Sequence, residues 1–302
     1  MADFTLRQLA YFVGIADAGS VSEAANQLHV SASALSNALT ELETSLGTQL
    51  CIRRKAHGVT LTPSGLTALT QARQVLRAAN EIRLAASCPD QGLHGTVSLG
   101  CYLSLAPTVV PPILEALGTM HPGITLRLVE STQDDLQRDL TAGELDLAAV
   151  YDMRLTGRHN RALLYEVTMH VLLPANHPLA GADAVDPTEL MHEPFILLDA
   201  PPSSEFTLGM LESLGHRPLI AHRTASYEMV RSLVARGLGW SVLVQRPANP
   251  VSYEGLPVVV KEITPAIPPI GVYLIWPEKF ALTPRAQAVV DCALDQKWPR
   301  GQ

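Results

Sequence analysis

The sequence predicts a chain of three parts: an N-terminal helical domain, a long connecting helix, and a C-terminal α/β body made of two Rossmann-like subdomains. Three observations lead to this prediction. Apolar residues recur at helical spacing over residues 5–46, and a second helical stripe covers residues 66–86. After residue 95, short apolar runs alternate with helical segments, which is typical of α/β folds with parallel sheets.

Length and composition exclude several other classes of protein. The 302 residues exceed the usual size of one domain. A hydrophobic content of 47% and a mean hydropathy of +0.15 supply enough apolar side chains for packed cores. The longest apolar runs, such as residues 145–151, have the length of a strand, so we expect no membrane span. The start of the chain lacks the basic and apolar regions of a secretory signal, which favours a cytoplasmic protein.

The cysteine and histidine residues show no spacing that is typical of a metal site. Cys51, Cys88, Cys101 and Cys292 are scattered without a Cys-x-x-Cys pair, and the ten histidines contain no pair at metal-ligand spacing. We therefore expect no metal, no cofactor and a reducing compartment. Cys101 would be a redox sensor only if a neighbouring cation lowered its pKa, and no Lys or Arg lies near it in the sequence, which favours a buried, inert thiol.

Charge divides the chain into a near-neutral head and an acidic body. The net charge is −7, and residues 1–88 contain seven Lys or Arg against six Asp or Glu. The remainder contains fifteen against twenty-three. This division fits a module that approaches a polyanion beside a module that does not, although a chance drift of composition gives the same pattern.

The first three predicted helices have a helix-turn-helix layout. The first ends at Gly19, and a capping box formed by Ser20 and Glu23 starts the second, which runs to Leu28. A turn over residues 29–31 leads to the third helix, which ends near Gly47. Two helices joined by so short a turn form the arrangement that places the second of them in the major groove of DNA.

Two groups of residues are candidates for contact with DNA. The exposed face of the third helix carries short polar side chains that can reach base edges or phosphates. The hairpin predicted over residues 51–62 has a basic tip that would lie against phosphates or the minor groove. A solvated helix face and a solvated turn would have similar sequences. The candidates are Ser31, Ala32, Ser33, Ser36, Asn37 and Thr40 on the helix, and Arg53, Arg54 and Lys55 on the hairpin.

The N-terminal sequence resembles a known family. The run LRQLAYFVGIADAGSVSEAANQLHVSASALSNALTELETSLGTQL, continued through the hairpin to LTPSG, resembles the winged helix-turn-helix of LysR-type transcriptional regulators. The resemblance implies a domain over residues 1–62 that binds double-stranded DNA. The family often has Gln and Pro where this chain has Ala32 and Ser33, and an aromatic residue where it has Cys51, so the DNA sequence that is read is not implied.

A long helix is predicted to connect the two halves over residues 63–90. Thr62 is expected to cap its N-terminus, with Pro63 in the first helical position. Its single apolar stripe needs a partner, either its own domain or the same helix of a second copy. In the resembled family this is the dimerisation helix, which implies a homodimer or homotetramer. The stripe consists of Leu66, Leu69, Ala72, Leu76, Ala79, Ile82 and Ala86.

The body over residues 91–302 is predicted to form two subdomains with a cleft between them. Crossings near residues 151–165 and 257–268 would link subdomain I, residues 91–160 and 268–302, with subdomain II, residues 161–267. A single strand is expected over residues 166–174. The segments GTVSLG, GELDLA, LLPANHPLA and LVARGLGWSVL resemble the effector domain of the same family, which has the periplasmic-binding-protein architecture.

Nine residues are candidates for contact with an effector in that cleft. Ser104 follows the first strand, where its hydroxyl either joins an anion site at a helix N-terminus or caps that helix. Thr132 and Gln133 hold the same place after the second strand. The aromatic candidates either line the cleft or plug the core; the resemblance implies that two of them, Phe206 and Tyr227, face the cleft. The full set is Tyr102, Leu103, Ser104, Thr132, Gln133, Ser204, Phe206, Ser226 and Tyr227.

The sequence contains no GxSxG, P-loop or HExxH motif, so we do not expect an enzyme. The leading interpretation is a DNA-binding transcriptional regulator whose operator binding is modulated by a small molecule. Two helix N-termini would face the cleft, which favours a small carboxylate as the effector. The alternative is a two-domain small-molecule binding protein whose helical head contacts proteins rather than DNA.

Overall fold

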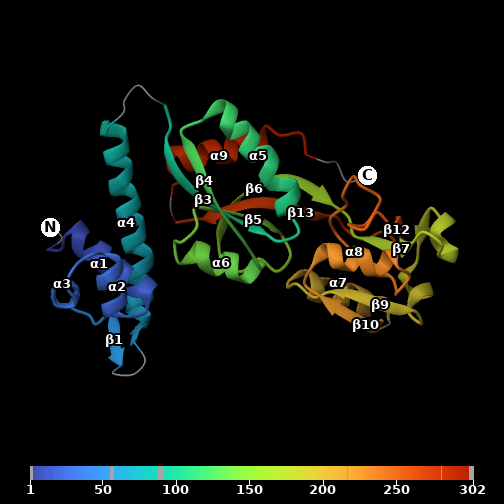
Figure 1. The fold of residues 1–302 in the computed structure, drawn as a ribbon, viewed down its shortest axis with the longest axis horizontal. Helices are drawn as coiled ribbons and strands as arrows, with labels where there is room; N and C mark the ends of the chain where they lie inside the picture. The colour runs from blue at the N-terminus through green and yellow to red at the C-terminus, as the bar shows by residue number, and fades with distance from the viewer. Residues whose placement is uncertain (1–2, 55–57, 88–91, 216, 280, 299–302) are drawn as a thin grey trace.

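The computed structural model describes residues 3–54, 58–87, 92–215, 217–279 and 281–298. Figure 1 shows three regions side by side: the N-terminal helices with the long helix α4, then subdomain I, then subdomain II. The predicted fold class is therefore confirmed, with an α-helical head on an α/β body.

The first three helices pack around one small core. Phe12, Leu35 and Leu39 are fully buried in it. Ser20 Oγ accepts a hydrogen bond from the backbone N–H of Glu23 at 3.0 Å, which is one half of the predicted capping box. The Glu23 carboxylate accepts from Gln27 instead of completing the box. The helices are α1 (Leu6–Ala18), α2 (Val21–Gln27) and α3 (Ala32–Leu46).

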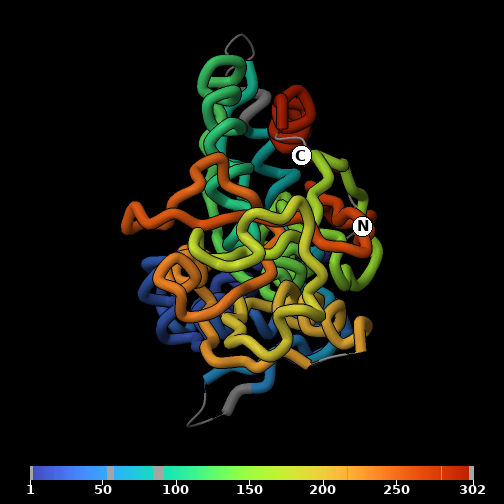
Figure 2. Tube along the Cα trace, turned by 90° about the vertical axis from the view of Figure 1, so that its right-hand side faces the viewer, coloured from blue at the N-terminus to red at the C-terminus, as the bar shows by residue number. Residues whose placement is uncertain are grey.

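A two-stranded antiparallel hairpin, β1 (Cys51–Arg54) and β2 (Gly58–Leu61), follows α3. The backbone N–H of Val59 donates to the carbonyl of Gly19 at 2.7 Å, which joins the hairpin to the end of α1. Gly58 has a φ of 72°, and an added Cβ would lie 2.4 Å from the same Gly19 oxygen, so this position requires glycine. In both Figure 1 and Figure 2 these strands lie at the end of the molecule opposite to helices α5 (Ala106–Met120) and α9 (Pro284–Leu294).

The connecting helix α4 (Pro63–Ser87) begins as predicted, because Thr62 Oγ1 accepts from the N–H of Gly65 at 2.9 Å. The apolar side chains of α4 lie in two different environments. Leu69 and Ala72 are buried against the N-terminal domain of the same chain. Further along, Val75 and Ile82 are 43% and 73% exposed. The helix therefore has both a docked face and an uncovered apolar face.

Subdomain I is built on a five-stranded sheet in the order β4-β3-β5-β13-β6, with α5 and α9 on one face and α6 on the other (Figure 1). The strands β4, β3 and β5 are parallel, whereas β13 runs antiparallel to both β5 and β6. The expectation of parallel sheets is therefore wrong for this strand, because the chain leaves for subdomain II and returns from the opposite direction. The elements are β3 (Gly95–Tyr102), β4 (Ile124–Ser131), α6 (Gln133–Thr141), β5 (Leu147–Tyr151), β6 (His159–Val167) and β13 (Ile270–Pro277).

Subdomain II contains a four-stranded sheet in the order β11-β7-β12-β8 and a parallel pair, β9 and β10. A bridge between Phe195 and Trp240 links the two, and these rings pack edge to face at 4.7 Å. The four-stranded sheet is also mixed, since β7 is antiparallel to β11 and β12 whereas β12 is parallel to β8. The elements are β7 (His170–Pro174), η1 (Pro178–Gly181), β8 (Ala184–Val185), η2 (Pro187–Leu190), β9 (Pro194–Leu198), α7 (Ser203–Ser213), β10 (Leu219–Thr224), α8 (Tyr227–Ala235), β11 (Ser241–Leu243) and β12 (Val258–Ile263).

The chain crosses between the subdomains at two adjacent points. The segment 166–174, expected to be one strand, is divided between β6 and β7, which belong to different sheets. The first crossing is therefore at residues 168–169, later than the expected 151–165, because β6 completes the sheet of subdomain I. The second crossing follows β12, a strand that occupies part of the segment expected to be a plain crossing.

A histidine is fully buried where the chain enters subdomain II. Burial, together with the positive charges of Arg246 and Arg231, lowers the pKa of His170 to about 3. The imidazole is therefore neutral at physiological pH, and it acts as part of the core rather than as a titrating group.

Candidate functional site

The face of α3 that points away from the core carries the predicted DNA-contacting residues. Ala32, Ser33, Asn37 and Thr40 are exposed, and Ser36 is half-buried. Ser31 Oγ accepts from the N–H of Ala34 at 3.1 Å, so this residue caps the helix. The set therefore forms one polar stripe along α3 with a helix cap at its beginning.

One side-chain amide on this stripe forms no hydrogen bond within the described part of the chain. Thr40 donates its hydroxyl hydrogen to the carbonyl of Ser36 at 3.0 Å, which leaves its oxygen able to accept only. The side chain of Asn37 makes no hydrogen bond with any residue that the structure describes. An exposed Asn with both a donor and an acceptor free is suited to pairing with a base edge.

Partly buried hydrogen bonds to a side chain of α3 hold the hairpin beside this helix. Glu43 Oε1, on α3, accepts from the backbone N–H groups of Leu50 and Cys51 at 2.8 and 3.0 Å, and these residues lead into β1. Arg53 and Arg54 lie on β1, so the predicted basic hairpin and the predicted recognition helix are adjacent. Lys55 lies outside the described residues.

Tyr102 joins the two subdomains across the cleft. Its ring is fully buried at the end of β3, and its hydroxyl donates to the carbonyl of Ala200 at 2.9 Å and contacts Ser203 Oγ at 3.0 Å, both in subdomain II. Burial raises the pKa of this phenol, which keeps it protonated and able to donate. An exposed ion pair between Arg154 and Glu205 also spans the two halves.

A small polar cavity remains behind Tyr102. Its volume is about 10 Å³, which is close to that of a single water site, and its lining includes Ser104, Ser203, Thr207 and Tyr227. Ser104 Oγ lies 3.2 Å from the hydroxyl of Tyr151. The helix α5 begins at Ala106 without a side-chain cap, so capping is not the role of Ser104. The subdomains are therefore closed over a small group of hydroxyls.

Several candidate effector residues have structural roles instead. Gln133 is fully buried in subdomain I, where its amide donates to the carbonyl of Met153 and accepts from the N–H of Tyr151 at 3.2 Å. The amide therefore satisfies backbone groups inside subdomain I, and Gln133 is absent from the lining of the small cavity. Thr132 and Ser226 cap α6 and α8.

The other candidates differ in burial. Ser204 is buried in the first turn of α7, whereas Phe206 is half-buried and Leu103 is exposed. None of the three lines the closed cavity as the structure describes it. Gln245 and Thr207 do line it, and the sequence analysis did not select them. Neither follows a predicted strand end in the manner that singled out Ser104.

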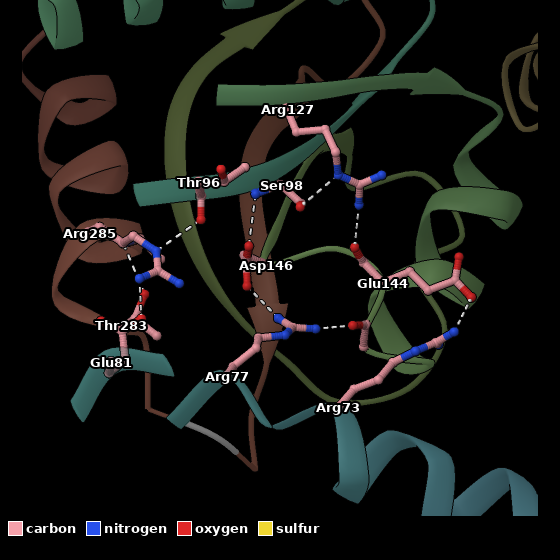
Figure 3. A network of polar contacts seen from close by, with 12 residues as sticks. Arg73, Arg77, Glu81, Thr96, Ser98, Arg127, Glu144, Asp146, Thr283 and Arg285 are labelled. Atoms are coloured by element: carbon pink, nitrogen blue, oxygen red, sulfur yellow. Dashed lines mark hydrogen bonds and ion pairs between the residues drawn. The ribbon is translucent and has the colours of Figure 1, made fainter. Parts of the chain in front are cut away.

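A network of arginines attaches α4 to subdomain I (Figure 3). Arg73 forms ion pairs with Asp17 of α1 and, at 3.0 Å, with Glu144 of subdomain I, and it donates to the carbonyl of Ala142 at 2.8 Å. Arg77 pairs with Asp146, whose second oxygen accepts from the backbone N–H of Ser98 at 2.8 Å. One short stretch of α4 therefore contacts both the N-terminal domain and the body.

A second pair lies one turn further along the same helix. Arg285, at the start of α9, pairs with Glu81 of α4 and donates to the carbonyl of Thr96 at 2.9 Å. Only the apolar stripe of α4 was predicted from the sequence. The charged residues between the apolar positions of α4 are the feature of the sequence from which this contact could have been predicted.

A helix-turn-helix head on a body of two α/β subdomains with a polar cleft defines a DNA-binding protein that responds to a ligand. Comparison with family models agrees. A model described as "Bacterial regulatory helix-turn-helix protein, lysR family" matches residues 6–66, and "LysR substrate binding domain" matches residues 90–298. The chain belongs to the LysR family of transcriptional regulators, which confirms the resemblance seen in the sequence.

Individual relatives extend over most of the chain. A probable hydrogen peroxide-inducible genes activator of Mycobacterium avium is 34% identical over 243 residues, which are 80% of this chain and 78% of that protein. The nitrogen assimilation regulatory protein nac of Escherichia coli (strain K12) is 32% identical over 290 residues, 94% of this chain and 92% of that protein. The crystal structure of HinK, a LysR family transcriptional regulator from Pseudomonas aeruginosa, is 33% identical with a TM-score of 0.65 and covers 98% and 99% of the two chains.

Among the residues that the structure describes, no three His, Cys, Asp or Glu side chains are grouped so as to hold a metal ion. No helix in the described part of the chain is both long and apolar enough to cross a membrane.

Proposed function

We propose that this regulator inserts α3 into the major groove, with Asn37 reading a base edge and Ser33 and Thr40 beside it. The observation that carries the proposal is the exposed, unused amide of Asn37 at the centre of a polar helix face. An Asn amide can pair with both N6 and N7 of adenine. Arg53, Arg54 and Lys55 would neutralise phosphates beside the groove.

Salt dependence of DNA binding tests this proposal. The purified protein is titrated against a labelled duplex from upstream of its own gene, with fluorescence anisotropy as the readout. We expect the logarithm of the association constant to fall linearly with the logarithm of salt concentration, and Arg53→Ala to reduce that slope by about 1. Binding that is equally tight to an unrelated duplex, or that does not change with salt, would contradict the proposal.

We also propose that three segments of the chain have separate functions. Residues 1–62 bind DNA, residues 63–90 pair two copies, and residues 91–302 bind the effector. The uncovered apolar side chains of α4, among them Val75 and Ile82, support pairing through this helix. A dimer presents two recognition helices to two half-sites, and two dimers form a tetramer. The protein would act in the cytoplasm as a regulator and not as an enzyme.

For the effector we propose a small carboxylate bound between the subdomains at the cavity behind Tyr102. The hydroxyls of Ser104, Ser203 and Thr207 converge there, and α7 and α8 begin at residues that line it. Hydroxyl donors and helix N-termini favour an anion. Because the closed cavity holds no more than about one water, binding requires the subdomains to separate, which breaks the Tyr102 contacts.

Replacing Ser104 tests the effector site. Carboxylates such as succinate and benzoate are screened for an increase in melting temperature, and the affinity of any that bind is measured. We expect Ser104→Ala to weaken that affinity about tenfold, the effect of one hydrogen bond to a charged group, and to leave DNA binding without effector unchanged. Ser213→Ala, at an exposed position outside the cavity, is the control. A loss of basal DNA affinity in Ser104→Ala would contradict the assignment.

The names of some relatives do not lead us to propose a peroxide response here. Peroxide reacts with thiolates. Cys51, Cys101 and Cys292 are all buried. Burial, with a smaller effect from Glu130, raises the pKa of Cys101, and burial also raises the pKa of Cys292. The thiols of Cys101 and Cys292 therefore remain protonated, which supports a bound ligand as the signal among the described residues; Cys88 lies outside them.

A further inference from the structure

A second cavity lies outside the cleft, between α4 and subdomain I. Its volume is about 350 Å³, within the range of sites that hold small molecules. One wall is the face of α4 formed by Gln74, Arg77, Ala78 and Glu81, at successive positions along one side of the helix. The opposite wall comes from the ends of α6 and β13 and the start of α9. The cavity thus lies between α4 and subdomain I, which the arginine network also connects (Figure 3).

The charges around this cavity are already neutralised. Arg77 is paired with Asp146, and Glu81 is paired with Arg285. A charged ligand would find no unpaired countercharge on the wall of α4, and burying it would carry an unfavourable desolvation energy. The occupant that fits is therefore uncharged.

The rest of the lining is apolar with a few hydrogen-bonding groups. Leu140, Leu145 and Leu282 form its floor, and Trp276 supplies an aromatic ring. The amide of Gln74 and the indole N–H of Trp276 form no hydrogen bond with the residues whose positions are described. An apolar surface with a small number of available polar groups is the usual composition of a small-molecule site.

We infer that this cavity is a second ligand site, for an uncharged, mainly aromatic or aliphatic small molecule that carries one hydrogen-bonding group. It is separate from the carboxylate site proposed above: its walls include α4, whereas the cleft lies between subdomains I and II. A ligand here contacts the DNA-linked helix and the body at once, so its occupancy changes how these two are held together.

The probe N-phenyl-1-naphthylamine tests this inference directly. It is neutral and apolar, carries one N–H group, becomes fluorescent in apolar surroundings and accepts energy from tryptophan. We expect saturable binding of one probe per chain, without DNA or effector, with energy transfer from Trp276. Trp276→Phe should lower that transfer, since it removes the tryptophan that lines the cavity.

A matched pair of variants locates the bound probe. Ala78→Phe places a ring in the cavity and should weaken binding at least tenfold. Asn80→Phe places the same ring on the opposite side of α4 and should bind like the natural chain. Circular dichroism establishes that both variants fold. Absence of saturable binding, or equal affinity in Ala78→Phe and the natural chain, overturns the inference; since neither DNA nor carboxylate is present, those outcomes leave the proposed function unaffected.

Discussion

Replacing Asn37 with Glu is expected to weaken binding to the operator by a factor of about 100 or more. The change removes a base contact worth about 1–3 kcal/mol and places a negative charge beside phosphates. The side chain is exposed and packs on nothing, so the fold of the head should not change. Fluorescence anisotropy at fixed salt measures the loss, and Asn37→Ala should have a smaller effect together with relaxed discrimination at one base pair.

The control for this variant adds the same charge elsewhere on α3. Ser45 is also exposed, but it lies near the C-terminal end of the helix, about two turns beyond Asn37. We expect Ser45→Glu to retain operator affinity within a few-fold. Equal losses in the two variants would show that net charge, rather than the recognition face, controls binding.

Replacing Arg77 with Met is expected to lower the melting temperature of the protein by about 5–10 °C. The Arg77 and Asp146 side chains are only 27% and 14% exposed, so the variant leaves a largely buried carboxylate without its partner. Breaking such a pair should cost about 2–3 kcal/mol, less than a fully buried pair because both side chains retain some solvent contact. Differential scanning calorimetry measures the shift.

Two further variants give this prediction its controls. Arg138 is also ion-paired, with Asp135, but its side chain is 68% exposed, so Arg138→Met should leave the melting temperature nearly unchanged. Adding Asp146→Asn to Arg77→Met should recover part of the loss, because no buried charge then remains unpaired while the amide oxygen still accepts from Ser98. A double variant less stable than Arg77→Met would contradict this account.

The helices were largely predictable from the sequence because their signals are local. Gly19 and Gly47 end α1 and α3, and Thr62 caps α4, as expected. The strand β10 was not predicted, since its residues are mostly exposed and show no regular alternation of apolar and polar side chains. Its partner in the sheet, β9, lies more than twenty residues away, beyond the reach of a local pattern.

The site was only partly predictable, for the same reason. The polar face of α3 follows from helical periodicity. By contrast, the two groups that Gln133 satisfies lie 18 and 20 residues away, and Tyr102 meets Ser203 across 101 residues. Whether a polar side chain faces a cleft or the interior depends on such distant partners. Residue type and position after a strand are the same for Ser104 and Gln133, yet only Ser104 lines the small cavity between the subdomains.

The two crossings between the subdomains also determine how the body can move. In subdomain I, Val167 of β6 pairs with Ile270 of β13, and in subdomain II, His170 of β7 pairs with Glu262 of β12. The two connections between the sheets, residues 168–169 and 264–269, therefore lie side by side. Two adjacent connections restrain sliding between the subdomains more than bending about them, so this arrangement favours an angle of opening as the motion of the body. Under the proposed function, the effector signal is that angle, set at the cleft and carried by subdomain I to the helix that holds the DNA-binding head.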